Sequence, residues 1–108
     1  MYTFESRVRF SEADHTELLT LPGLVNYFQD CSTFQSEDIG YGVESLKKSG
    51  QAWILSAWQI VVNRYPKLGE YIRVSTWATD FTGLFGLRNF KMEDEAGEMT
   101  AWANSLWV

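Results

Sequence analysis

Residues 11–42 read SEADHTELLTLPGLVNYFQDCSTFQSEDIGYG, a short acidic loop that leads into the only long helix that the sequence predicts. Thr20 is suited to cap the start of this helix, and Pro22 is tolerated in its first turn. Side chains then recur at steps of three and four residues, the spacing of one helix face. They are Leu21, Leu24, Val25, Phe28, Cys31 and Gln35. Gly40 and Gly42 are expected to end a helix that is buried on much of its circumference.

Most of the remaining chain has the period of two that is typical of strands. Strands are predicted at 2–10, 52–65, 71–81, 84–93 and 98–108, and a short helical turn at 43–48. The strand at 52–65 is apolar on both faces, so both faces should be covered. Short turns at 66–69, 82–83 and 94–97 join antiparallel neighbours. This order predicts one α+β domain over residues 1–108, a long central helix wrapped by a curved antiparallel sheet.

The composition excludes several classes of protein. The chain has 108 residues, a net charge of −5 and 45% hydrophobic residues. An acidic surface repels phosphate backbones, so nucleic acid is not expected as a partner. One cysteine allows no internal disulfide and fits a reducing cytoplasm. Because neither a signal peptide nor a bilayer-spanning stretch is visible, we expect a soluble, cytoplasmic protein.

The loop before the helix carries the first candidates for chemistry, Asp14 and His15. A carboxylate just before a helix lies near unpaired N–H groups, and those groups could polarise a carbonyl. The alternative is that Asp14 is an ordinary loop carboxylate. His15 is the only histidine and Cys31 the only cysteine, so a zinc or iron site is not expected. Nucleotide loops and the serine-hydrolase elbow are absent, so no cofactor is expected.

Three other features have two interpretations each. Cys31, on the apolar helix face, is expected to be a buried thiol rather than a nucleophile. Arg88, Asn89 and Asn104 either line a pocket or face solvent from their strands. The five tryptophans either line an acyl pocket or, as is commoner in sheets, form part of the core.

Five segments are informative together, LPGLVNYFQD at 21–30, DIGYG at 38–42, AWILS at 52–56, VSTW at 74–77 and RNF at 88–90. In this order and spacing they resemble the bacterial acyl-acyl-carrier-protein thioesterases. The resemblance implies the hotdog fold and two such domains in one chain, of which this is the N-terminal one. The last predicted strand also ends on its apolar pattern, which favours a chain that continues past Val108.

In that family, a motif of the form D-x-N-x-H in the second domain is assigned the hydrolysis. The aligned loop here holds Asp14 at the aspartate position, Thr16 at the asparagine and Leu18 at the histidine. The resemblance therefore implies a domain that shapes the acyl pocket without supplying the base. Its implied partners are acyl carrier protein bearing a fatty acyl chain and a second hotdog domain or homodimer partner. Candidate pocket residues are Asn26, Phe28, Gln29, Trp53, Leu55 and Trp58.

Two alternatives remain open at this point. One is a stand-alone hotdog acyl-CoA thioesterase, in which Asp14 of a homodimer activates water or attacks the thioester. The other is a non-catalytic acyl-binding or dimerisation module. The leading hypothesis is a domain of an acyl-acyl-carrier-protein thioesterase, an enzyme of fatty acid biosynthesis that hydrolyses thioesters to release free fatty acids.

Overall fold

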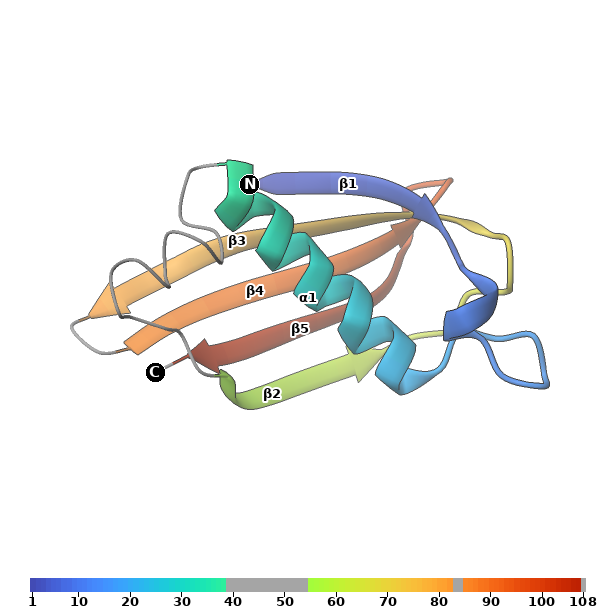
Figure 1. Cartoon of the computed structure of the whole chain (residues 1–108), viewed down its shortest axis with the longest axis horizontal. Helices are drawn as coiled ribbons and strands as arrows, with labels where there is room; N and C mark the ends of the chain where they lie inside the picture. The colour runs from blue at the N-terminus through green and yellow to red at the C-terminus, as the bar shows by residue number, and fades with distance from the viewer. Residues whose placement is uncertain (39–54, 83–84, 108) are drawn as a thin grey trace.

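The computed structural model describes residues 1–38, 55–82 and 85–107 (Figure 1). The predicted turn at 43–48, the helix-ending glycines and residues 52–54 lie outside these ranges. The elements follow in the order β1 (Tyr2–Arg7), η1 (Phe10–Glu12), α1 (Leu21–Asp38), β2 (Leu55–Val62), β3 (Tyr71–Thr82), β4 (Phe85–Asp94) and β5 (Met99–Trp107). One long helix and five strands were predicted, and both are present.

The five strands form one antiparallel sheet in the order β1-β3-β4-β5-β2. Register shifts interrupt the pairing of β3 with β4, β4 with β5 and β2 with β5. Such irregularities bend strands and increase their twist. Helix α1 crosses one side of this sheet diagonally, from near the Val62 end of β2 towards β1 (Figure 1). We call the side that α1 covers the helix face and the opposite side the outer face.

The core lies between α1 and the helix face. Leu24, Phe28 and Cys31 are buried on the helix, as the spacing predicted, and Tyr27 is buried beside them. The Phe28 ring stacks 5.1 Å from the Phe90 ring and 6.3 Å from the Trp58 ring. Opposite this cluster, the described side chains that β5 buries on the helix face are small, namely Ala101, Ala103 and Ser105. Large side chains of α1 therefore fill the space above β5.

The start of α1 is fixed by its contact with the preceding loop. The Gly23 N–H donates to the Thr20 hydroxyl at 3.0 Å, which confirms Thr20 as the cap. The Thr20 N–H donates to the Glu12 carbonyl at 2.9 Å. Gly23 is needed for this approach, since a Cβ there would lie 2.7 Å from the same carbonyl oxygen. Leu21, predicted on the buried stripe, is 46% exposed as the first helical residue.

Two strand predictions were too long. The strand predicted at 2–10 ends at Arg7, because Val8 exchanges main-chain hydrogen bonds with the turn before β3 and the chain then enters η1. Phe10 is consequently 84% exposed instead of sharing the buried face of Val8. Similarly, β2 ends at Val62, and the Asn63 and Arg64 N–H groups both donate to the Thr100 carbonyl.

Candidate functional site

The loop that holds Asp14 is a small hairpin in front of α1. A bridge pairs Ala13 with Leu19, and the Asp14 N–H donates to the Leu18 carbonyl at 3.1 Å. Glu17, at the turn, has a φ of 62°. The hairpin packs on the turn between β2 and β3, where the Leu19 N–H donates to the Pro66 carbonyl and the Leu68 N–H to the Glu17 carbonyl. These contacts hold the loop against a segment about 50 residues away in sequence.

The Asp14 carboxylate is already engaged by its own loop. It accepts a hydrogen bond from the Thr16 N–H at 2.8 Å and a second from the Thr16 hydroxyl. These two bonds hold the pKa of Asp14 below its usual value, so the carboxylate is ionised at neutral pH. The side chain is exposed, as is His15. The Thr20 hydroxyl bonds the Gly23 N–H in the first turn of α1, whereas the Asp14 carboxylate bonds only Thr16 among the described residues, so the structure gives Asp14 no role at the helix N-terminus.

The predicted pocket residues fall into three groups. Phe28 and Trp58 meet on the helix face, with Phe28 buried and Trp58 half-buried on β2. Asn26 and Gln29 are exposed on α1, and the Asn26 amide donates to the Glu12 carboxylate at 3.2 Å. Leu55 opens β2, but its side chain lies outside the described part of the chain, as does all of Trp53. Among the candidates whose side chains the structure describes, only Phe28 and Trp58 therefore come together.

The half-buried Arg88 lies on the helix face near the C-terminal half of α1. Its Nη1 donates to the Gln35 side-chain oxygen and to the Thr76 hydroxyl, the latter at 3.3 Å. The strand register sets Arg88 opposite Ser105, and Ser105 in turn opposite Trp58. From the sequence alone, the Arg88 side chain could either line a pocket or face solvent. The available signal was its spacing, because Arg88, Phe90 and Met92 alternate along β4 and so share one face.

Asn89 and Asn104, the other two polar strand residues, lie opposite each other on the outer face. They line a shallow hollow of about 260 Å³ with Trp77, Lys91, Met99 and Trp102. This hollow is on the side of the sheet away from α1, so it is separate from the row that contains Arg88. Of the three tryptophans whose side chains are described, Trp77 and Trp102 thus face outward rather than into the core.

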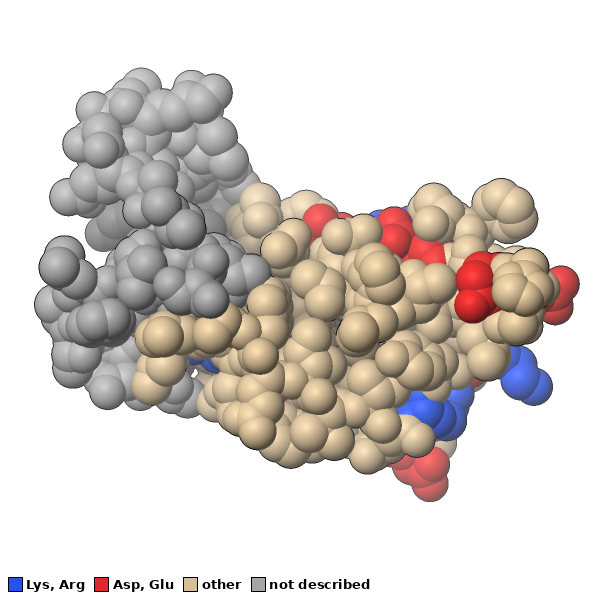
Figure 2. Space-filling model, turned by 90° about the horizontal axis from the view of Figure 1, so that it is seen from below, with Lys and Arg blue, Asp and Glu red and all other residues tan. Residues whose placement is uncertain are grey.

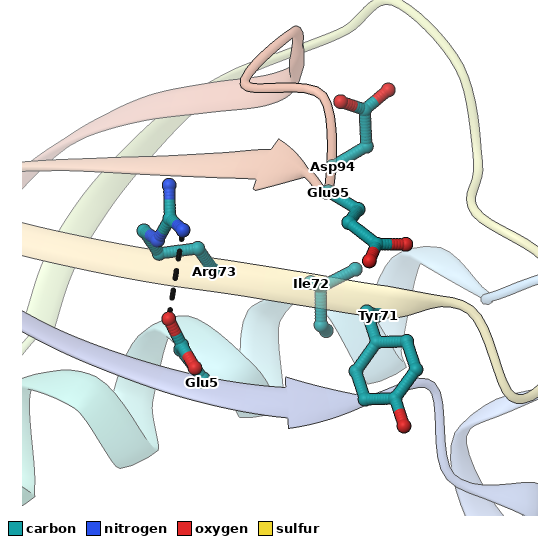
Figure 3. Close-up of a pocket in the computed structure, with 6 residues that line it drawn as sticks. All are labelled: Glu5, Tyr71, Ile72, Arg73, Asp94 and Glu95. Carbon is teal, nitrogen blue, oxygen red and sulfur yellow. Dashed lines mark ion pairs between the residues drawn. The ribbon is translucent and has the colours of Figure 1, made fainter.

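A second hollow, of about 310 Å³, lies at the end of the sheet where β1, β3 and β4 meet (Figure 3). The Glu5 carboxylate pairs with Arg73 at 3.5 Å. Asp94 is bonded to Arg64 at 3.0 Å and accepts the Glu98 N–H at 2.9 Å. Glu5 and Asp94 thus already have partners, and the third carboxylate of this hollow, Glu95, is exposed to solvent.

Cys31 is buried between α1 and β3, with its Sγ 3.5 Å from the Val74 carbonyl. Burial raises the pKa of its thiol to about 12. A thiolate is the nucleophilic form, so Cys31 is inert at neutral pH, as predicted. In the described ranges, no three His, Cys, Asp or Glu side chains gather to hold a metal ion. None of the described helices has the length and apolar character required to cross a bilayer.

The edge strand β2 presents an uncharged surface. Its sequence, LSAWQIVV, contains no ionisable side chain, and Trp58, Ile60 and Val62 are half-buried on the helix face. Seen from this side, the middle of the described surface shows no Lys, Arg, Asp or Glu (Figure 2). Within the described sheet, β2 pairs only with β5, which leaves its other edge unpaired.

Comparison with known proteins assigns these features to a family. Residues 1–108 match the family model of the acyl-ACP thioesterase N-terminal domain. A chloroplastic palmitoyl-acyl carrier protein thioesterase of Gossypium hirsutum is 28% identical over 109 residues, which cover 94% of this chain and 26% of that protein. The chain thus spans about a quarter of this curated relative.

Solved structures agree over the whole chain. An acyl-ACP thioesterase from Bacteroides thetaiotaomicron superimposes with a TM-score of 0.90 at 29% identity, covering 98% of this chain and 44% of that one. A Lactobacillus plantarum protein assigned as an oleoyl thioesterase gives a TM-score of 0.96 at 26% identity, covering 99% and 42%. These likenesses confirm the hotdog fold. By its match from the first residue to the last, the chain belongs to the acyl-ACP thioesterase family, in the part that forms the N-terminal domain.

Proposed function

We propose that this chain is the N-terminal hotdog domain of a two-domain thioesterase that hydrolyses fatty acyl thioesters of acyl carrier protein. The enzyme would release free fatty acids in the cytoplasm. The domain would form one wall of the acyl pocket, and a second hotdog domain would supply the base. The single cysteine fits a reducing cytoplasm and so supports this location.

One observation carries this proposal. The family match covers all 108 residues, yet the loop aligned with the catalytic motif keeps only its aspartate, Asp14. Hydrolysis of a thioester needs a group that activates water and donors that stabilise the oxyanion. Leu18 offers neither, and Thr16 is bonded to Asp14 within the hairpin. The family resemblance and the local geometry therefore favour a supporting role for this domain.

The second domain would pair with the free edge of β2. A strand with one free edge and no charge is a template for another strand. On α1, Leu21 and Val25 follow the same side as Phe28 at steps of four and three, and Phe28 faces Trp58 of β2. These helix residues and the half-buried β2 side chains Trp58, Ile60 and Val62 would make an apolar seam. We place the fatty acyl chain along this seam.

Acyl carrier protein is the partner that this function requires. With a net charge of −5, this domain is a poor docking face for an acidic carrier protein. We therefore assign most of the carrier contact to the second domain. Trp53, Leu55, Asn26 and Gln29 remain predicted pocket residues, of which Asn26 and Gln29 would need to meet the acyl chain from the exposed side of α1.

The proposal is tested by reading the gene beyond Val108 and by assaying its full product with acyl carrier protein thioesters. A second helix preceded by D-x-N-x-H is expected. Replacing the histidine of that motif should lower kcat by a factor of about 100 or more, the usual effect of losing a general base. Asp14→Asn in this domain should leave kcat within about twofold, because exposed loop changes rarely reach a distant site.

Two outcomes would contradict the proposal. Turnover by the 108-residue chain alone that disappears in Asp14→Asn would establish a stand-alone thioesterase. Binding of acyl chains without hydrolysis by the full gene product would establish a non-catalytic module.

A further inference from the structure

Arg88 carries a positive charge that no described carboxylate neutralises. The ion pairs of the described residues involve Arg9, Arg64, Arg73 and Lys91, and none involves Arg88. Its partners, Gln35 and Thr76, are neutral. A cation that is half-buried without a counter-charge is costly to a fold and requires an explanation. Burial also lowers the pKa of this guanidinium, although arginine remains charged at any physiological pH.

Arg88 has donors that its described partners do not use. Its hydrogen bonds to Gln35 and Thr76 both use Nη1, so the Nε and Nη2 groups have no partner among the described residues. At the same time, no buried side-chain nitrogen or oxygen of the described residues lacks a partner. Within the described part of the chain, the Nε–Nη2 edge is therefore available to a ligand. Through the parallel N–H groups of this edge, arginine can bind both oxygens of a carboxylate or the single oxygen of a carbonyl.

The surroundings of Arg88 suit the polar end of an apolar ligand. Across the helix face, Arg88, Ser105 and Trp58 form one row on three adjacent strands, and the two large residues flank the small one. Two strand spacings separate Arg88 from Trp58, or about 10 Å. The next row is apolar throughout, with Phe90, Ala103 and Ile60. A chain lying along the β2 seam would thus meet charge at one end only.

The two-fold symmetry of the proposed domain pair places the row of Arg88, Ser105 and Trp58 on the side where the helix of the second domain begins. If a second hotdog domain extends the sheet antiparallel to β2, a pseudo-two-fold axis relates the two helices, and they run in opposite directions. The first turn of α1 lies near the Val62 end of β2 (Figure 1). The partner helix then begins over the opposite end of the seam, the Leu55 end, and the row of Trp58 and Arg88 lies nearer to that end than the row of Ile60 and Phe90. Helix N-termini present unpaired N–H groups to anions and carbonyl oxygens.

From these observations we propose that Arg88 binds the oxygen at the head of the acyl chain, as the thioester carbonyl in the substrate and as the carboxylate in the released fatty acid. Gln35 and Thr76 act as positioning residues, which hold Nη1 and direct the Nε–Nη2 edge towards the seam. Neutral partners can orient the guanidinium and leave its positive charge available to the ligand, whereas an ion pair with a carboxylate would neutralise that charge. The inference rests on the proposed function and adds a ligand group to this domain.

The test compares Arg88→Met with Arg73→Met in the full gene product. Arg73 is the matched control, because it is an arginine of the neighbouring strand β3 that faces outward and pairs with Glu5. Inhibition by decanoate and by decanol, which has the same chain without a carboxylate, isolates the head group. We expect Arg88→Met to weaken decanoate inhibition about tenfold or more and to leave decanol unchanged, since a hydrogen bond to a charged group is lost. Arg73→Met should match wild type for both.

The thioester arm uses kcat and KM for a decanoyl-acyl-carrier-protein substrate. A higher KM or a lower kcat of Arg88→Met shows that Arg88 contacts the thioester carbonyl. If only inhibition by decanoate is weakened, Arg88 binds the carboxylate of the product. Arg88→Lys keeps the charge without the fork, and its inhibition by decanoate should be intermediate. This variant keeps the test informative if Arg88→Met fails to fold.

Separate results contradict the two proposals. If wild type turns over acyl-carrier-protein thioesters but Arg88→Met and Arg88→Lys respond to substrate and decanoate like wild type, the role of Arg88 is excluded and the proposed function stands. If wild type shows no turnover, the proposed function fails. Calorimetric binding of decanoate and decanol then still decides the role of Arg88: an equal affinity of wild type for both excludes it, and a preference for decanoate that is lost in Arg88→Met supports it.

Discussion

At the scale of single residues, Gly23 sets how closely α1 approaches its loop. A Cβ at this position would lie 2.7 Å from the Glu12 carbonyl oxygen and 2.9 Å from the Glu12 Cβ. Alanine is favoured over glycine in helices by about 1 kcal/mol. The clash with backbone outweighs this gain, because overpacking costs about 1–3 kcal/mol and the carbonyl also accepts the Thr20 N–H. We expect Gly23→Ala to lower the free energy of unfolding in urea.

The control for this prediction is Gln29→Ala, an exposed position on the same helix. It should change the free energy of unfolding by less than about 0.5 kcal/mol, since exposed substitutions are close to neutral. If Gly23→Ala is as stable as wild type, the loop that contains Glu12 can move away from the added Cβ. The close packing of Glu12 on α1 is then not required for stability.

At the scale of elements, Arg64 ties the end of β2 to the start of β3 and to the hairpin after β4. It pairs with Glu70 at 2.5 Å and with Asp94 at 3.0 Å. Hydrogen bonds from Arg64 hold the pKa values of both carboxylates below their usual values. A carboxylate whose pKa is lower in the folded state stabilises the fold above its unfolded pKa. That stabilisation is lost as the pH falls through the folded pKa.

The wild-type melting temperature should therefore fall more steeply between pH 6 and pH 3 than that of Arg64→Met, in which the two pKa values rise towards those of the unfolded chain. The control is Lys67→Met, an exposed residue of the same turn whose side chain makes none of these bonds. Equal slopes for wild type and Arg64→Met between these pH values would show that the cluster does not couple the three elements.

The elements also show how far the sequence could predict this molecule. The strands β3, β4 and β5 lie within two residues of their predicted ends, because alternation and turn residues are local signals. The hairpin around Asp14 was not predicted. It is held by bonds between Leu19 and Pro66 and between Glu17 and Leu68, which no local pattern reveals. For the same reason the direction of Arg88 required the strand register, and its contact with Gln35 joins residues 53 positions apart.

At the scale of the whole molecule, the free β2 edge and the apolar side of α1 predict association. Leu21 tests this best, since it is 46% exposed and lies on the side of α1 that continues to Phe28 and Trp58. A lysine there places a charge inside the seam once a second hotdog domain pairs with β2, whereas in the single domain it meets water. The cost of a buried unpaired charge should then fall on association and not on folding.

We expect the wild-type chain to self-associate in sedimentation velocity, with itself in place of the second domain, and Leu21→Lys to remain monomeric at the same concentration. Met99→Lys is the matched control, because Met99 is 43% exposed and borders the outer-face hollow instead of the seam. All three proteins should have similar melting temperatures at low concentration, which separates loss of association from loss of folding. A dimer that persists in Leu21→Lys but dissociates in Met99→Lys would place the interface on the outer face, and the acyl chain could then not lie beside Trp58.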